Sequence, residues 1–341
     1  MCSSDLGTNE YVYLNDTRNQ PMLLSDAIKI FKHPDIKVAL SSGRKVDFMP
    51  ARKLIVPVNK ENALKSGIVP ASLADKIQDT IVLEIPESKG YLTKPELFTL
   101  DLLSSYEWDR PIHVLSQGGD LDIGIKDYLM HDGFSCHIVP FKNKVSAIDP
   151  GIVDTDRLYK QMTETYSWDA MRRDDYFVDY QNLITHLGVI SERGIFVEAA
   201  TAFLNKGEFD RAVEMLDLCQ KSVPDTLYPL ETLCIGFSGN DYMVIKMVEY
   251  YLLLTEREKG LRLAAKLGDA LLTLMRYDLQ TLPYSKSELE TCSNYLYYLI
   301  DILQERHETE FASVLTDSMK QLLGTGGSGG GTEPASAPPA Q

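Results

Sequence analysis

Residues 93–115 read TKPELFTLDLLSSYEWDRPIHVL, and this stretch decides how the N-terminal half of the chain folds. Thr93 followed by Glu96 three residues later forms a capping box, and Pro95 is tolerated in a first helical turn. Leucines then recur at helical spacing, which gives one apolar face. A helix is therefore predicted to begin directly after Thr93.

The segment that follows this helix predicts a βαβ-like unit. Pro111 removes a backbone donor, so the helix ends before it and a strand at 112–115 begins. A short helix at 123–130 and a second strand at 136–139 complete the unit, and its crossover is expected to be right-handed. Trp108, at the corner after the helix, is expected to pack against the sheet, with stacking on a ligand as the alternative.

Two further β-type runs lie upstream, at 53–58 and 81–85. Pro57 lies in the first of them and favours an edge position, because proline cannot donate to a ladder. Strands with interleaved helices indicate an α/β domain, which we place at residues 10–150 with a linker at its end.

Beyond residue 151 the pattern is helical without a convincing strand. One stretch matches the tetratricopeptide pattern, in which Gly207 ends a first helix and Pro224 follows a second. The matching residues are Phe196, Ala199, Ala200, Phe203, Gly207, Phe209, Ala212, Leu216, Cys219 and Pro224. In this pattern, Phe203, Phe209 and Leu216 are expected to fill the groove between the two helices.

A looser copy of this repeat follows, at Met247, Val248, Tyr251, Gly260, Ala264 and Leu267. A third helix pair at 292–306 and 308–323 is expected to close the stack, because helical repeats need neighbours to bury their faces. The predicted fold class is thus an α/β domain followed by an all-α tetratricopeptide-like helical repeat domain at 151–323. Residues 324–341 are expected to be a disordered Gly/Pro/Ala tail, and residues 1–9 a non-native or fragment start.

Composition excludes several classes of function. The formal charge of −15 disfavours nucleic acid and anionic membrane surfaces as partners. No window approaches the length of apolar sequence that a membrane span needs. Five cysteines are scattered along the chain without the spacing of zinc ligands. We therefore interpret them as small buried residues.

Two groups of residues are candidates for a chemical site. Gly118 and Gly119 follow a strand but lack the phosphate-loop signatures, so a plain turn is favoured over a nucleotide site. His113, His131 and His137 lie close in sequence, and structural histidines are favoured over a metal site because no ligand spacing connects them. We therefore expect no catalytic residue, cofactor or metal in this chain.

The richest polar stretch is residues 168–179, WDAMRRDDYFVD. We interpret it as a salt-bridged corner that joins the two domains, with contact to an acceptor or a membrane part as the alternative. The candidate contact residues are Trp168, Arg172, Arg173, Tyr176 and Asp179.

Several blocks of the sequence resemble one bacterial family. The blocks are residues 48–60, 102–112 with Trp108-Asp109-Arg110-Pro111-Ile112, 127–140, and 153–156 with Tyr159, Trp168 and Phe177-Val178-Asp179. The family consists of polytopic membrane proteins of unassigned function related to the GT-C-fold protein O-mannosyltransferases. The resemblance covers nearly all of residues 10–320, and it corresponds to the soluble region after the last membrane span.

This resemblance implies a non-catalytic part of a membrane glycosyltransferase-like protein, on the extracytoplasmic (periplasmic) side of a bacterial inner membrane. The catalytic carboxylates of such enzymes lie in the membrane region, which would use a polyprenyl-phosphate sugar and is the expected partner. A protein acceptor is a second expected partner. The chain would brace the enzyme or present the acceptor. Two alternatives remain: a free-standing tetratricopeptide-type adaptor that binds a peptide in its groove, and a small α/β enzyme.

Overall fold

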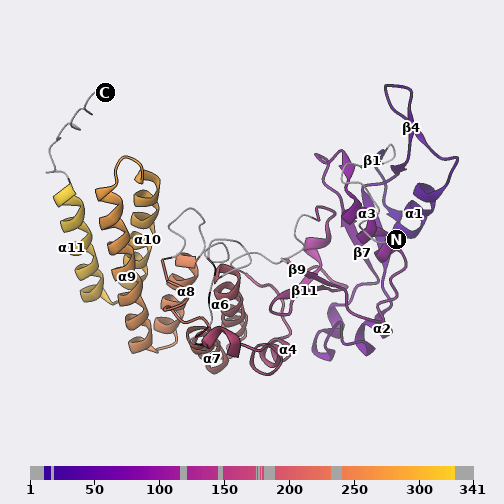
Figure 1. The fold of residues 1–341 in the computed structure, drawn as a ribbon. Helices are drawn as coiled ribbons and strands as arrows, with labels where there is room; N and C mark the ends of the chain where they lie inside the picture. Colours follow the sequence, from indigo (N-terminus) through magenta and orange to yellow (C-terminus); the bar gives the residue numbers. More distant parts are fainter. Residues whose placement is uncertain are drawn as a thin grey trace, which may run out of the picture. The chain divides into compact units, whose positions relative to one another are not determined.

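The computed structural model describes residues 11–16, 19–115, 121–144, 149–173, 175, 177, 179, 189–231 and 240–326. The chain divides into two compact units, Met1–Thr165 and Tyr166–Gln341. The first unit is mixed α/β and the second is a run of packed helices, which confirms the predicted fold class (Figure 1). No helix of the described residues is long and apolar enough to cross a membrane.

Small sheets form the first unit. Their strand orders are β5-β1-β8, β2-β6-β7, β10-β11-β9 and the pair β3-β4. The bounds are β1 Val12–Leu14, β2 Met22–Leu23, β3 Val38–Ala39, β4 Lys45–Val46, β5 Phe48–Met49, β6 Lys53–Pro57, β7 Thr80–Glu84, β8 Tyr91–Leu92, β9 His113–Leu115, β10 Leu129–His131 and β11 Ser135–Ile138. The helices of this unit are α1 Leu24–Lys32, α2 Lys60–Lys65, α3 Lys94–Ser104 and α4 Thr155–Lys160.

Helix α3 begins as the sequence predicts. The Glu96 side chain accepts from the Thr93 backbone N–H at 2.8 Å, and the capping box is complete. After the helix, Trp108 is fully buried and its Nε1 donates to the carbonyl of Pro57 at 2.8 Å. Trp108 therefore fastens the helix corner to the end of β6, which confirms its packing role.

The predicted βαβ unit is wrong. Strand β11 pairs antiparallel with both β9 and β10, so these strands form an antiparallel sheet without a crossover. The predicted helix at 123–130 is a 3-10 turn at Ile125–Asp127 followed by β10. The cause is a local hairpin: the Asp132 N–H donates to Ser135 O at 2.8 Å, with Gly133 at φ 90° in the turn.

The edge position predicted for residues 53–58 is also wrong, because β6 lies between β2 and β7. Pro57 is the last residue of β6 and pairs only with Thr80 of β7. Strand β2 pairs with Leu54 and Ile55 and does not extend to Pro57. The missing N–H of Pro57 therefore interrupts no ladder.

The outer edge of β7 is covered by residues 124–128. The hydroxyl of Tyr128 bonds both the N–H and the carbonyl of Val82, each at 3.1 Å. Gly124, at φ 79°, lies so close to Glu84 that an added Cβ would overlap the backbone of Glu84. Covering a sheet edge in this way keeps it from pairing with another chain.

Helix pairs form the second unit, as Figure 1 shows for the residues coloured red to yellow. They are α6 Val189–Lys206 with α7 Phe209–Ser222, α8 Asn240–Leu253 with α9 Arg257–Gln280, and α10 Lys286–Glu305 with α11 Thr309–Gly326. Helix α6 packs against α8, and α8 against α10, so the first helices of the pairs adjoin one another. The last helix extends to residue 326, beyond the predicted end of the repeat domain.

Most tetratricopeptide positions form the interior of this unit. Gly207 ends α6 at φ 75° and is exposed, Pro224 is half-buried, and the other apolar residues of the pattern in both copies are buried except Phe209. Phe209 is 57% exposed and does not fill the groove. Phe209 is the first residue of α7. Because side chains on a helix point back toward the helix N-terminus, its ring points beyond the end of the groove.

Residues 151–165 belong with the α/β unit, although the sequence places the domain division after residue 150. Asn143 accounts for part of this: its side chain donates to Leu129 O and Ile152 O and accepts from the Ile152 N–H at 2.7 Å. Arg157 of α4 adds a bond from Nη1 to Gly67 O at 3.2 Å. These polar contacts join distant residues, so helical periodicity alone does not indicate them.

Candidate protein-interaction face

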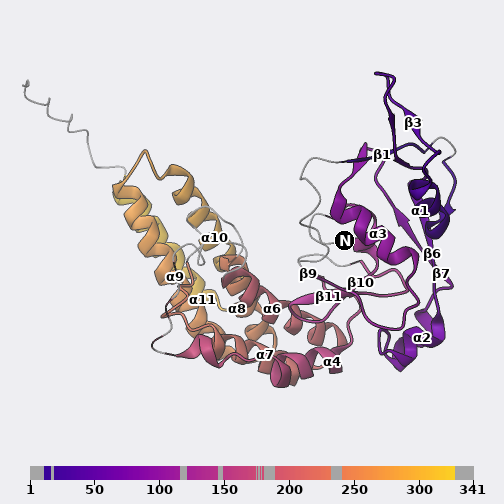
Figure 2. The ribbon, with the colours of Figure 1, turned by 45° about the vertical axis from the view of Figure 1, so that its right-hand side comes forward.

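The first helices α6, α8 and α10 carry a half-buried row of aromatic and charged side chains. Figure 2 shows these helices following one another within the helical unit. We call this row the first-helix face, and it consists of Thr201, Tyr242, Lys246, Glu249, Tyr250, Tyr298 and Arg306. Helical repeat proteins bind polypeptides on continuous surfaces of this kind.

Side-chain contacts connect the three helices across the face. The hydroxyls of Thr201 in α6 and Tyr250 in α8 lie 2.8 Å apart. Tyr242 of α8 stacks on Tyr298 of α10, with ring centroids 5.9 Å apart and planes only 4° from parallel. The face therefore has a fixed geometry before any partner arrives, which lowers the entropy cost of binding.

Two cations share one carboxylate at the centre of the face. Lys246 and Arg306 each approach a different oxygen of Glu249, both at 2.8 Å. Burial works to raise the pKa of Glu249, but hydrogen bonds from these two side chains hold it below its usual value. Burial likewise works to lower the pKa of Lys246, and the hydrogen bond and charge of Glu249 raise it. The cluster is a charged network at neutral pH, and it carries one net positive charge.

Lys246 also lies near two aromatic rings. Its Nζ is 5.7 Å from the ring centroid of Tyr242 and 5.9 Å from that of Tyr250. Such cation–π contacts favour a charged ammonium group. A partner on this face would meet a cation flanked by tyrosine rings, which suits a polypeptide carboxylate or carbonyl.

Glu198 lies one turn before Thr201 on α6. Burial raises the pKa of its carboxyl from the ordinary 4.5 to about 7. The cause is desolvation, which penalises the charged form. This carboxyl is therefore the group near the first-helix face whose charge changes close to neutral pH.

A second polar cluster joins the helix pairs on another side of α8. The Tyr251 hydroxyl donates to Asp217 of α7 at 2.9 Å and accepts from Gln220 at 2.6 Å. Lys259 of α9 then pairs with the other oxygen of Asp217 at 2.8 Å. Tyr251 is fully buried, so this cluster fixes how the first two pairs pack.

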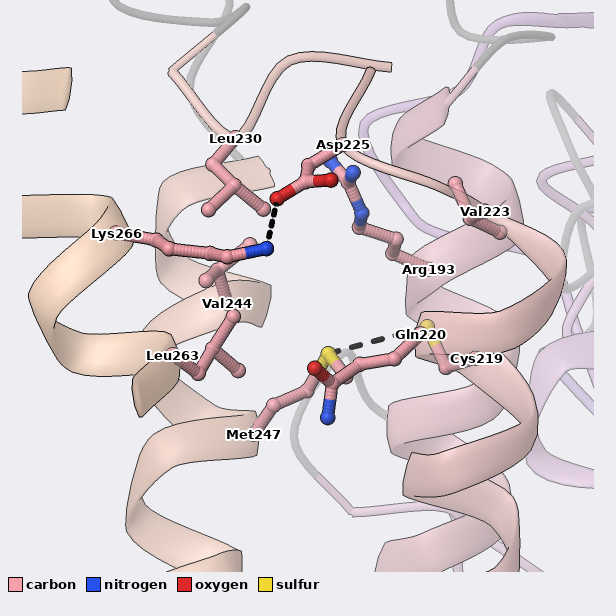
Figure 3. Close-up of a pocket in the computed structure, with 10 residues that line it drawn as sticks. All are labelled: Arg193, Cys219, Gln220, Val223, Asp225, Leu230, Val244, Met247, Leu263 and Lys266. Atoms are coloured by element: carbon pink, nitrogen blue, oxygen red, sulfur yellow. Dashed lines mark hydrogen bonds and ion pairs between the residues drawn. The ribbon is translucent and has the colours of Figure 1, made fainter. Parts of the chain in front are cut away.

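A cavity of about 60 Å³ opens between α7, α8 and α9 (Figure 3). Arg193 lines it but uses its guanidinium on the carbonyls of Tyr228 and Pro229. Lys266 lines it and pairs with Asp225 at 2.6 Å. Ligand pockets are several-fold larger, at about 300–1,000 Å³. The polar groups of this cavity hold the segment after α7 in place.

The three histidines of the α/β unit occupy structural positions. His137 is buried, with Nδ1 2.6 Å from Asp132 Oδ2 and Nε2 2.8 Å from Ile68 O. His113 faces Ser135 Oγ at 3.1 Å, and burial lowers its pKa despite the nearby Asp132. The buried His131 lies 3.6 Å from Cys136 Sγ, and burial lowers its pKa too. Among the described residues, no group of histidine, cysteine, aspartate or glutamate has the arrangement of a metal site.

The candidate contact residues of the 168–179 segment do not form one cluster, and each has its own neighbours. Trp168 is 5% exposed and packs against Phe196 of α6, with centroids 4.6 Å apart. Arg172 donates to Ser222 of α7 at 2.9 Å. Asp179 is exposed, whereas Tyr176 lies outside the described residues, as do Gly118 and Gly119.

Arg173 of the same segment forms an exposed two-bond pair with Asp175, at 2.8 and 2.5 Å. Such a pair fixes a local turn and adds little stability. The expected contact of this segment with the α/β domain stays a prediction.

Sequence reasoning missed the first-helix face. Its residues lie between the positions of the tetratricopeptide pattern, which marks only the interior. The available signal was the clustering of tyrosines at 242, 250 and 298 on the first helix of a pair, outside the interior positions. Tyrosine and arginine are enriched at protein interfaces, so this clustering indicates a contact surface.

Comparison with protein families gives one match: residues 4–157 match the family model of TMEM260-associated domain 2. TMEM260 is a family of membrane proteins related to protein O-mannosyltransferases. The matched residues lie within the α/β unit and end in α4. Comparisons with curated proteins and with solved structures gave no match.

Proposed function

We propose that this chain, whose residues 4–157 match TMEM260-associated domain 2, is an accessory region of a TMEM260-like membrane glycosyltransferase. In this role it serves protein O-glycosylation by holding a polypeptide acceptor or by bracing the membrane-embedded part. The family match carries the proposal. The sequence resemblance to O-mannosyltransferase-related membrane proteins points to the same class.

The chemistry of the chain's own carboxylates supports an accessory role. Glu249 is held by Lys246 and Arg306, and Asp132 by His137 and Arg157. Carboxylates in such pairs are engaged in structural contacts rather than poised to move a proton or attack a sugar. The donor sugar and the catalytic groups would come from the membrane part of the parent protein.

The first-helix face is the part of the chain that we assign to the polypeptide partner. Its rigid tyrosines supply contact area at low entropy cost, and its charged centre supplies orientation. The α/β unit would then be the connection to the enzyme. In this proposal both units lie on the extracytoplasmic side, where the acceptors of such enzymes would meet the polyprenyl-phosphate sugar.

The test compares membranes that contain the full parent protein with membranes whose parent lacks residues 11–326. Transfer of the sugar to a secreted acceptor polypeptide is measured in both, after the amount of enzyme in the membrane is equalised. We expect transfer to fall when the region is missing, while the isolated chain transfers no sugar. Transfer by the isolated chain, or full activity without it, would contradict the proposal.

A substitution on the first-helix face separates acceptor holding from bracing. Lys246→Ala removes the cation between Tyr242 and Tyr250, and Lys320→Ala on α11 is the matched control. If the face holds the acceptor, the KM for the acceptor rises with kcat unchanged only in the first variant. If the region braces the enzyme, the yield of folded enzyme changes instead.

The side of the membrane is tested separately. A single cysteine introduced on an exposed position, such as Lys320→Cys, is labelled with a membrane-impermeant reagent in intact cells. Labelling supports the extracytoplasmic side. Labelling only after the inner membrane is opened would contradict it.

A second candidate function is a free-standing adaptor of the tetratricopeptide type, which the helix pairs of the second unit favour. The two functions predict different coding sequences upstream of this chain. Hydrophobic spans in frame upstream of residue 8 support the accessory role, and a start codon without spans supports the adaptor. The adaptor should also bind peptides on the first-helix face without any membrane protein.

A further inference from the structure

The last turn of α9 and the turn that connects it to α10 expose three large apolar side chains within eight residues. Tyr277 is 62% exposed, Leu282 is 44% exposed and Tyr284 is 93% exposed. Tyr284 is the most exposed large hydrophobic side chain among the described residues. Single exposed apolar residues are ordinary, but a group of this kind at one tip indicates a contact surface.

Hydrogen bonds make this turn rigid. The Thr281 N–H donates to the carbonyls of Tyr277 and Asp278, and the Tyr284 N–H donates to Thr281 O at 3.1 Å. The Ser285 hydroxyl donates to Asp278 O at 2.8 Å and lies 2.6 Å from Thr281 Oγ1. These bonds hold the turn in one conformation, so the apolar side chains are presented without a cost of ordering the loop on contact.

The charge of the turn differs from that of the whole chain. The chain carries −15, yet residues 279–287 contain no carboxylate and one cation, Lys286. The nearest flanking carboxylates are shielded, since Asp278 is buried and Glu288 is half-buried. The next one, Glu290, is exposed and lies 3.9 Å from Lys286. Residues 279–287 can therefore approach a low-dielectric region without an acid of their own to desolvate.

We propose that this turn rests in the interfacial layer of a lipid bilayer. Tyrosine is enriched at that level because its ring is apolar and its hydroxyl reaches water and headgroups. The strongly negative chain favours zwitterionic over anionic lipid. A lipid surface fits better than a basic protein partner, because residues 279–287 offer no acid to pair with one.

Contact by three side chains is weak for a free molecule and becomes effective when the chain is held near the membrane. Tethering converts the contact into an intramolecular event with a high effective concentration. The proposal uses the membrane-bound parent of the proposed function as this tether. The test supplies an artificial tether instead, so it can fail or succeed independently of any glycosylation assay.

The test places a fluorescent reporter on the turn. Tyr284→Trp is made, and Tyr297→Trp on α10, at a tyrosine that is 53% exposed, is the matched control. Both native tryptophans, Trp108 and Trp168, are buried, so lipid-borne quenchers report mainly on the new residue. Each variant is tethered through a polyhistidine tag, at either end in turn, to phosphatidylcholine vesicles with nickel-chelating and brominated lipids.

We expect the emission of the Tyr284→Trp variant to shift to shorter wavelength and to be quenched with at least one tether. The Tyr297→Trp variant should keep the emission of the untethered protein. Adding Tyr277→Ser and Leu282→Ser to the Tyr284→Trp variant should abolish the quenching with the helical circular dichroism unchanged. Equal quenching of the two reporters would overturn the proposal. So would the absence of quenching at position 284 with both tethers, which would assign the tip to a protein partner.

Discussion

Arg157 and Asp132 join α4 to the turn between β10 and β11: the Arg157 Nε lies 3.2 Å from Oδ1 of a carboxylate that is buried. The other oxygen of Asp132 lies 2.6 Å from the Nδ1 of His137. Through Arg157 Nη1 and His137 Nε2, the same cluster also holds the carbonyls of Gly67 and Ile68. Three separate parts of the α/β unit thus converge on one carboxylate.

Substitution of Arg157 by leucine should destabilise the α/β unit. The change leaves a buried carboxylate without its guanidinium partner. Breaking a fully buried pair costs about 3–5 kcal/mol, and we expect a loss below that range because Arg157 is partly exposed. Arg173→Leu breaks the exposed pair with Asp175 and is the control, with no measurable change expected. Urea unfolding of the two variants measures the difference. Equal effects would mean that the Asp132 cluster does not stabilise the unit.

Substitution by alanine should reduce stability to different extents at two glycines with positive φ. Gly207 has open space around an added Cβ, so only the left-handed backbone is penalised, by about 1–2 kcal/mol in the helical unit. Leucine at this position should pay the same backbone cost. At Gly124 an added Cβ would overlap the backbone of Glu84, so the α/β unit should lose more stability.

Thermal melts of Gly207→Ala, Gly207→Asn and Gly124→Ala test this comparison. Asparagine tolerates the left-handed region, so Gly207→Asn should fall between wild type and alanine. A Gly207→Ala variant as stable as wild type would contradict the repeat turn. A Gly124→Ala variant no worse than Gly207→Ala would contradict the close approach of residues 124–128 to β7.

Local patterns account for what could be predicted from the sequence. The capping box at Thr93 and the small residues of the helix pairs lie within a few residues of the contacts they make, so their spacing is informative. The direction of β11 depends on a turn at Asp132 and Gly133, and periodicity alone cannot distinguish a hairpin from a crossover. Apolar runs therefore indicate where the strands lie, but they do not indicate how the strands pair.

The first-helix face could not be predicted from local sequence patterns. Its contacts connect Thr201 with Tyr250 and Glu249 with Arg306, which are about fifty residues apart. Interior positions obey a repeat pattern because packing demands small or apolar residues there, whereas outward positions are free to vary. The interior was therefore predictable, and the outward face became visible only when the helices were placed side by side.

Replacement of Trp168 by alanine should lower the stability of the helical unit. Its buried ring packs against Phe196 and, edge-on at 5.9 Å, against Tyr166. Removing a buried tryptophan costs about 3–5 kcal/mol, and Trp168→Phe should recover part of it. If residues 168–179 also join the two domains, as the sequence predicts, the substitution should separate a single melting transition into two. Calorimetry measures both the midpoint and the number of transitions. An unchanged midpoint of the helical transition would contradict the packing role of Trp168.

The pH dependence of the helical unit should carry the signature of Glu198. Its pKa in the folded chain, about 7, lies above the ordinary 4.5, so the folded state binds the proton more tightly than the unfolded state. The associated stability is fully present below about pH 4.5 and is lost as the pH rises through about 7. The shift corresponds to about 3 kcal/mol as an upper bound.

Glu198→Gln removes this loss, because the amide stays neutral at every pH. The variant should exceed wild type in stability at about pH 8 and lose that advantage at about pH 4.5. Glu305→Gln, at an exposed position of α10, is the matched control and should follow the wild-type profile. Urea midpoints measured across this range give the comparison. If Glu198→Gln also followed the wild-type profile, the buried carboxyl beside the first-helix face would already be charged near pH 5, and burial would not control its charge.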